Sequence, residues 1–143
     1  MVDIYSPLKR SLLMARIGPR DSKPERIVRA ALRKLGYGRM YRMNVKSVKG
    51  KPDFAFVRIK KAIFVHGCFW HQHPRCKRAR LPESNPKFWK LKLRANAIRD
   101  RETIRYLNKS GWKCHIIWEC KMQDSELIRV GLGKFLSGKR TLR

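Results

Sequence analysis

Acidic residues are scarce in this chain of 143 residues, where 10 Asp and Glu stand against 36 Lys and Arg and the formal net charge is +26. A surface of that charge repels itself, so a polyanionic partner stabilises it, and nucleic acid is the leading candidate. A membrane surface is the alternative. It would require a basic amphipathic helix with one continuous apolar face, and the sequence contains none as clear as that.

Long apolar runs are also missing. None approaches the length of a membrane span, and the N-terminal stretch MVDIYSPLKRSLLMARIGPR has no secretory apolar region. We therefore expect a cytoplasmic protein without a membrane partner. In a reducing cytosol the four cysteines, Cys68, Cys76, Cys114 and Cys120, are metal ligands or buried thiols before they are disulfides.

The chain has neither an internal repeat nor a low-complexity linker, and its length and 43% hydrophobic content predict one folded domain. We place that domain at residues 22–143, behind a basic N-terminal arm at residues 1–21. The apolar spacing predicts helix, strand, strand, helix, strand and helix, at residues 22–35, 53–58, 61–66, 86–109, 112–120 and 125–136. Ser22 is the expected N-cap of the first helix and Asn85 that of the long helix. This order indicates an α/β fold in which a mixed β-sheet is flanked by helices.

The segment FVHGCFWHQHPRC, residues 64–76, combines three histidines, two cysteines and a Phe-Trp pair. Two thiolates and one imidazole from this loop, with a distant third thiolate, would complete a tetrahedral Cys₃His zinc site. Spacing does not choose His71 over His73, or Cys120 over Cys114, although Cys114 lies inside a predicted strand and is more typical of core packing. The alternative is that the thiols are buried and the histidines solvated.

Few carboxylates are available for catalysis, and Asp53 is prominent because it follows Pro52 at the start of an apolar strand. Such a carboxylate suits Mg²⁺ once a substrate phosphate shares the ion, although a turn-capping role is an equal reading. Asn96 and Asp100 share one helical face, where a solvated stripe is the simpler interpretation. Glu25 is explained by its position in the capping box of the first helix, without a further function.

The aromatic neighbours Phe69 and Trp70 point apart on any regular element, so they are not both routine core residues. In a loop held by zinc, they could be wedges that unstack DNA base steps. The alternative is that Trp70 covers the metal site. Met14, in the basic arm, is either a further wedge or an ordinary apolar contact.

The motifs RSLLM, SKPE, KPDFAF, IFVHGCFWHQHPRC, FW with N-x-x-x-D, and GW…IIWEC follow one another over about residues 10 to 120. In this order they resemble the very-short-patch-repair (Vsr-type) DNA mismatch endonucleases, which implies a restriction-endonuclease-like fold with a structural zinc site. The resemblance implies that Asp53 and the backbone carbonyl of Val65 bind catalytic Mg²⁺, and that His71 assists proton transfer with the attacking water. Val65 stands where family members carry Thr, which matters little if only the carbonyl is used.

The remaining roles are implied by the same resemblance. Four residues would support the site and its hydrated metals: His66, Glu25, Asn96 and Asp100. Four would bind zinc: Cys68, His73, Cys76 and Cys120. Three would intercalate beside the mismatch: Met14, Phe69 and Trp70.

The resemblance therefore implies a monomeric, nucleoid-associated, Mg²⁺-dependent endonuclease. It would nick one strand of double-stranded DNA on the 5′ side of the T in a T·G mismatch, to initiate repair of deaminated 5-methylcytosine. The rival interpretations are a same-fold nicking or homing-type nuclease with another target, and a zinc-stabilised DNA-binding protein without catalysis.

Overall fold

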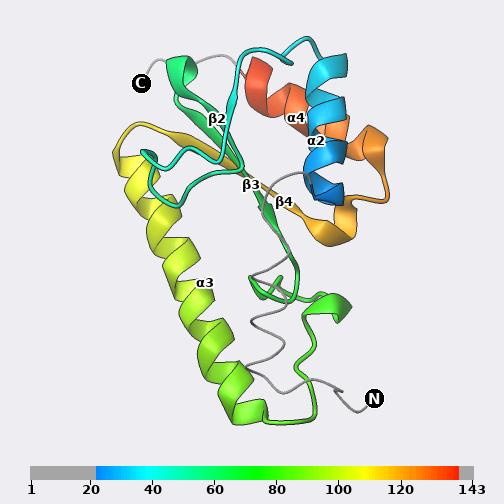
Figure 1. Cartoon of the computed structure of the whole chain (residues 1–143), viewed down its shortest axis with the longest axis vertical. Coiled ribbons are helices and arrows are strands. Elements are labelled where there is room, and N and C mark those ends of the chain that lie inside the picture. The colour runs from blue at the N-terminus through cyan, green and yellow to red at the C-terminus, as the bar shows by residue number, and fades with distance from the viewer. Residues whose placement is uncertain (1–21, 139–143) are drawn as a thin grey trace.

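The computed structural model describes residues 22–138, which form one mixed sheet with helices on both faces (Figure 1). The strands lie in the order β1 (Arg42–Met43), β2 (Phe54–Phe56), β3 (Lys61–His66) and β4 (Lys113–Trp118). The first two pairings are antiparallel, and β3 pairs with β4 in parallel. A parallel pair needs a long crossover, and helix α3 (Pro86–Lys109) supplies it.

Helices α2 (Lys23–Lys34) and α4 (Ser125–Ser137) lie together on one face of the sheet, and α3 lies on the other (Figure 1). Two separate apolar clusters result. The larger, under α2 and α4, is built of Val28, Ala31, Leu32, Phe54, Phe56, Ile63, Ile117, Ile128, Leu132 and Leu136. The smaller, on the α3 side, is built of Val48, Ala62, Phe64 and Leu107.

The two-residue repeat of β3 and β4 decides which side chains reach α3. Ile63 and Ile117 belong to the larger cluster, whereas Phe64 and Ile116 pack in the smaller one. Because side chains alternate along a strand, His66 and Trp118 face α3 as well. These two residues are register partners at the carboxyl ends of the parallel strands. They form the floor of the site described below.

The structure shortens two predicted strands and adds one that was not predicted. Residues Val57–Ile59 form a 3-10 helix instead of continuing β2, and Glu119–Lys121 form another after β4. Strand β1 has only two residues and no apolar run, so its sequence carries no signal. Asn85 does precede α3, but it adopts a left-handed conformation and its side chain makes no capping bond. Ser22 caps α2 as predicted, accepting a hydrogen bond from the Glu25 amide at 3.3 Å.

A glycine allows the loop before β2 to dock on α3. Gly50 has φ +83°, and a Cβ added there would lie 2.3 Å from the Cγ2 of Thr103. Only glycine combines that conformation with so close an approach. The docking carries the following residues, Lys51, Pro52 and Asp53, to the end of the sheet where His66 lies.

Candidate active site and metal-binding cluster

Two groups of side chains at the carboxyl ends of β3 and β4 could hold a metal ion within residues 22–138. One contains His66, His71 and Asp100, and the other is a cluster of three cysteines and one histidine. The first group, together with Asp53 and Val65, lines a cavity of about 250 Å³. Residues far apart in the sequence therefore meet at one place.

Asp53 is held by the backbone of β3. The ladder between β2 and β3 ends at the pair Phe54 and Ile63, and Pro52, two residues before Phe54, has no N–H with which to extend it. The Val65 amide instead donates to Asp53 Oδ2 at 2.7 Å. Burial raises the pKa of Asp53 to about 6, the Val65 hydrogen bond opposes the rise, and the negative charge of Glu25 adds to it.

Glu25 contributes to this electrostatic environment from the first turn of α2. Its side chain is 3% exposed, so it is part of the interior and not a surface cap. Two carboxylates that influence each other near a cavity are a recurrent feature of sites that bind cations. The capping interpretation of Glu25 therefore explains the hydrogen bond of its amide but not the burial of its carboxylate.

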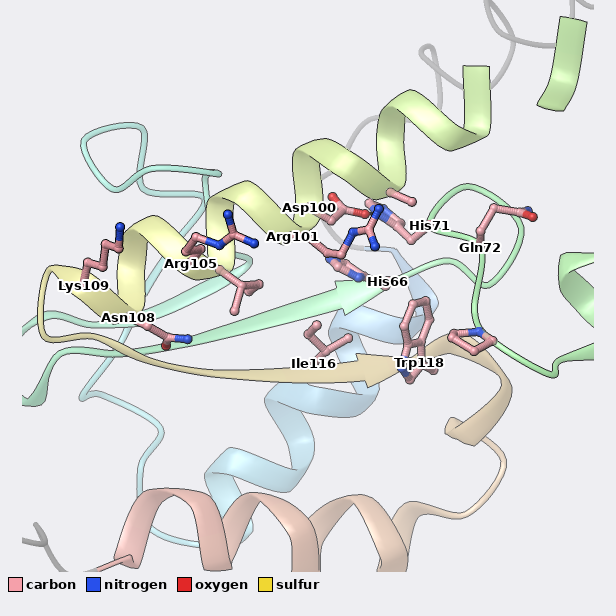
Figure 2. Close-up of a pocket in the computed structure, with 13 residues that line it drawn as sticks. His66, His71, Gln72, Asp100, Arg101, Arg105, Asn108, Lys109, Ile116 and Trp118 are labelled. Atoms are coloured by element: carbon pink, nitrogen blue, oxygen red, sulfur yellow. The ribbon is translucent and has the colours of Figure 1, made fainter. Parts of the chain in front are cut away.

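A histidine–carboxylate pair also lines the cavity. His71 Nδ1 lies 2.6 Å from Asp100 Oδ2, and Figure 2 shows the two side chains adjacent between α3 and the loop after β3. The ring of His66 stacks on that of His71 with centroids 3.8 Å apart. Burial, and then the charge of His71, lower the pKa of His66 to about 4. His66 is therefore the neutral ring of the stacked pair, and it packs against His71, the ring that Asp100 orients.

Asn96 plays a different part from Asp100, although both lie on one face of α3. Its Nδ2 donates to the backbone carbonyl of Trp70 at 3.2 Å, which ties the loop to the helix. The solvated-stripe interpretation is therefore wrong for this pair: both side chains are partly buried and both bond to the loop between β3 and α3.

The second group consists of Cys68, His73, Cys76 and Cys120, whose ligand atoms all lie within 4.8 Å of one another. His73 Nδ1 is 3.7 Å from Cys68 Sγ and 3.4 Å from Cys120 Sγ. Cys114 is not a member. It packs in the smaller apolar cluster, where burial raises its pKa to about 11. The geometry thus selects His73 and Cys120 from the alternatives that spacing left open.

Phe69 and Trp70 do not point apart. Both rings contact Trp89 of α3, at centroid distances of 5.4 and 5.9 Å, and they contact each other at 5.2 Å. Trp89 is fully buried, whereas Phe69 and Trp70 are only partly covered. The divergence expected on a regular element does not arise, because the two residues lie in a loop without regular two-residue alternation. Met14 lies outside the described residues.

Three residues near the cavities were not predicted from the sequence. Lys51 and Arg99 line the cavity of Asp53, and Trp118 connects the two groups. The Trp118 ring stacks on His73 at 4.1 Å and meets His66 edge-on at 5.3 Å. Lys51 and Arg99 could not be recognised from the sequence, because nothing there distinguishes them from the other Lys and Arg residues among the 36 in the chain. Trp118 could have been noticed, because it directly precedes the Glu-Cys of the last motif.

No helix among residues 22–138 has the length and apolar content that a membrane crossing requires.

Comparison with known proteins gives matches over most of the chain. A family model described as DNA mismatch endonuclease Vsr matches residues 2–78. The chain is 37% identical over 136 residues to the type II nicking enzyme V.NmeAIP of Neisseria meningitidis serogroup A, covering 95% of each chain. It is 36% identical over 128 residues to the DNA mismatch endonuclease Vsr of Escherichia coli K12, covering 90% of this chain and 80% of the relative. With the type II nicking enzyme V.NaeI of Lentzea aerocolonigenes it shares 42% identity over 110 residues, 73% of this chain and 64% of that protein.

The fold, the site and these similarities define the class of protein: it is a DNA endonuclease, and therefore a hydrolase. More narrowly, the chain belongs to the Vsr family of DNA mismatch endonucleases, which places it in DNA mismatch repair.

Proposed function

We propose that this protein is a Mg²⁺-dependent endonuclease that nicks one DNA strand on the 5′ side of the T in a T·G mismatch, and so initiates repair of deaminated 5-methylcytosine. The observation that carries the proposal is that Asp53 and the pair His71–Asp100 line one cavity in a member of this family. Two of the three relatives described above are named nicking enzymes, which supports cleavage of a single strand. We further propose that it acts as a monomer in the cytoplasm, on the nucleoid.

Asp53 and Val65 suit a Mg²⁺ site. Mg²⁺ is commonly held by one or two carboxylates together with water and substrate phosphate, so a large protein cage is not needed. The Val65 N–H points at Asp53, and because N–H and C=O of one strand residue point to the same side, the Val65 carbonyl is directed toward this edge too. A bound Mg²⁺ would polarise the phosphate and lower the pKa of the attacking water. Glu25, which is buried and whose charge raises the pKa of Asp53, adds negative charge to the site.

His71 is positioned to handle a proton. Because its Nδ1 faces Asp100, its Nε2 is left for a water molecule or for the leaving oxygen. Asp100 fixes the tautomer and the ring plane, in the way that a carboxylate orients an imidazole in hydrolytic triads. His66 supports the ring from below while staying neutral itself. Asn96 holds the loop that carries His71.

We propose that Cys68, His73, Cys76 and Cys120 bind a structural zinc ion. Three sulfurs and one nitrogen are a usual zinc ligand set, and a tetrahedron with Zn–S bonds of about 2.3 Å has edges of roughly 3.8 Å. The two distances from His73 Nδ1 to sulfur, 3.7 and 3.4 Å, are close to that size. The ion would order the loop that presents His71.

Phe69 and Trp70, with Met14, are proposed to intercalate beside the mismatch. Both rings are partly exposed and rest on the buried Trp89, so a rigid base supports them. Unstacking costs a few kcal/mol per base step, and a mismatch lowers that cost. Trp70→Ala should therefore weaken binding to mismatched duplex more than binding to matched duplex, as measured by titration with labelled DNA. Equal losses on both duplexes would mean that the ring only covers the metal cluster.

The decisive experiment compares strand cleavage of a T·G duplex and its matched T·A control, with and without Mg²⁺. The proposal expects a single nick, in the T strand, only with the mismatch and only with Mg²⁺. Cleavage of both duplexes would favour a same-fold nuclease with another target. Binding without cleavage under any metal would favour a zinc-stabilised DNA-binding protein.

A further inference from the structure

A second, larger cavity opens next to the catalytic one. It has a volume of about 890 Å³ and lies between α3 and β4, at the free edge of the sheet (Figure 2). Its inner end is formed by His66, His71 and Asp100, which also line the cavity of Asp53. Anything that occupies the larger cavity therefore lies directly beside the proposed scissile phosphate.

One rim of this cavity is a row of cations on α3. Arg101, Arg105 and Lys109 are spaced four residues apart, all three are exposed, and all three line the cavity. Figure 2 shows them following one another along the helix, away from Asp100. Four helical residues rise about 6 Å, so the row forms a regular track of positive charge that leads away from the catalytic residues. Such a track suits the phosphates of a single strand.

An apolar wall is formed by side chains from both α3 and β4. Ile104 of α3 and Ile116 and Trp118 of β4 line the cavity, and all three are partly buried. A cation row beside an apolar wall matches the two halves of a nucleotide, since the base is apolar on its faces and the phosphate is an anion. A protein partner would more often be met by an apolar patch with a mixed rim, whereas the rim on α3 carries one sign of charge.

We propose that this cavity binds the nucleotide of the cut strand that flanks the scissile phosphate, with its base against Ile104 and Ile116 and its phosphate on Arg101 and Arg105. This rests on the proposed nuclease function, because it takes the cavity of Asp53 as the phosphate site. The nicked strand end is the natural occupant. Once the bond is cut, an end nucleotide loses one stacked neighbour and is easier to draw out of the duplex.

The test uses a T·G duplex synthesised with the nick already present, so that binding is measured without catalysis. Single abasic residues are placed in turn at each position flanking the nick in the cut strand. With the wild-type protein, loss of the base at one flanking position should weaken binding by about tenfold. With the double variant Ile104→Ala, Ile116→Ala the same abasic substitution should cost almost nothing. If base removal costs the same in both proteins at every position, the wall contacts no base and the proposal is overturned.

Because both isoleucines pack beside the smaller apolar cluster, a second pair of variants tests the rim without risk to the fold. Arg101→Ala and Arg105→Ala should each reduce the slope of log affinity against log salt on the nicked duplex by about 0.7 to 0.9. The control is Lys134→Ala, an exposed cation of α4 on the other face of the sheet, which should leave the slope unchanged. Slopes equal to that of the control would overturn the assignment of the rim. If the protein cleaves DNA normally but shows neither the abasic-site effect nor the change in salt slope, only the proposed nucleotide binding in the cavity is refuted. If both effects are seen in a protein that never cleaves, only the proposed nuclease function is refuted.

Discussion

Replacing Asp53 by Asn should stabilise the metal-free protein while abolishing cleavage. The buried carboxyl has its pKa raised from 3.8 to about 6, so the folded state resists ionising it. A group with a raised acid pKa adds no cost below pH 4, where it is protonated in both states. Stability is then lost as the pH rises from about 4 to about 6, and the loss is complete above that range. Asn does not titrate, and it can still accept the hydrogen bond from Val65.

The size of the effect follows from the pKa change. A rise from 3.8 to about 6 corresponds to at most about 3 kcal/mol in the free energy of unfolding. Asp53 is partly open to the cavity, where water screens its charge, so we expect about 1 to 2 kcal/mol at pH 8. For a domain of this size that is a rise in Tm of about 3 to 8 °C.

The assay is thermal unfolding between pH 4 and pH 8 in buffer without Mg²⁺ and without chelator, so that the proposed zinc is retained. The control is Glu102→Gln, which removes an exposed carboxylate of α3 and should change Tm little at any pH. Mg²⁺ added at a hundred times its Kd should then increase the free energy of unfolding of the wild type by about 2.7 kcal/mol, which raises its Tm, and should leave the Tm of Asp53→Asn unchanged. A Tm difference that is the same at pH 4 and pH 8 would refute the reasoning from burial. Wild-type cleavage by Asp53→Asn in Mg²⁺ would refute the catalytic role.

Three further substitutions test other parts of the structure. Cys120→Ser should lower both the zinc content, from about one ion per chain, and Tm, whereas Cys114→Ser should keep the metal; full metal retention in the first variant would overturn the ligand set. Asp100→Asn should lower the cleavage rate by about a hundredfold with little change in DNA affinity, because the charge that orients His71, the proposed catalytic imidazole, is gone; an unchanged single-turnover rate would refute this. Gly50→Ala should destabilise the fold by about 2 to 3 kcal/mol in denaturant unfolding, since its φ is +83° and its Cβ would meet a methyl group of α3 at 2.3 Å. Gly111→Ala, at φ +86° with no contact closer than 3.8 Å, is the matched control and should cost only about 1 kcal/mol; equal costs would mean that the close approach is unimportant.

The helices could be predicted from the sequence because their signals are local. Helix α3 begins at Pro86 and ends at Lys109 as predicted, with Gly111 two residues further on at positive φ. The strands were harder. Val57 continues the apolar run of β2, so residues 53–58 were predicted as one strand. The chain instead turns there through a 3-10 helix and Lys60, which has a left-handed conformation. The sequence does predict a tight turn between the two strands, at residues 58–61, but not that the turn begins at Val57, where β2 ends its pairing with β3.

The sequence predicted which types of residue form the candidate site, but not how they are arranged in space. The crowding of Cys and His in residues 64–76 indicated a metal cluster, and the motifs for the family indicated which acids to consider. Spacing alone did not choose between Cys120 and Cys114, although the position of Cys114 inside a predicted strand favoured core packing for it. The parallel register of β3 with β4 separates them, because it places Cys114 opposite Ala62 in the sheet and carries Cys120 past the strand end to Cys68.

By itself the sequence determined the basic charge, the helix positions, the ligand types and the family, because composition, caps and motifs are properties of the chain in one dimension. Only the tertiary structure decided that Glu25 is buried beside Asp53, that Asp100 pairs with His71, and that Asn96 holds the loop instead of facing the cavity. It also revealed the cavity between α3 and β4. The physical reason is that a carboxylate or an imidazole acquires its pKa and its partner from neighbours in space, and those neighbours come from distant elements, as with His71 and Asp100, which lie 29 residues apart.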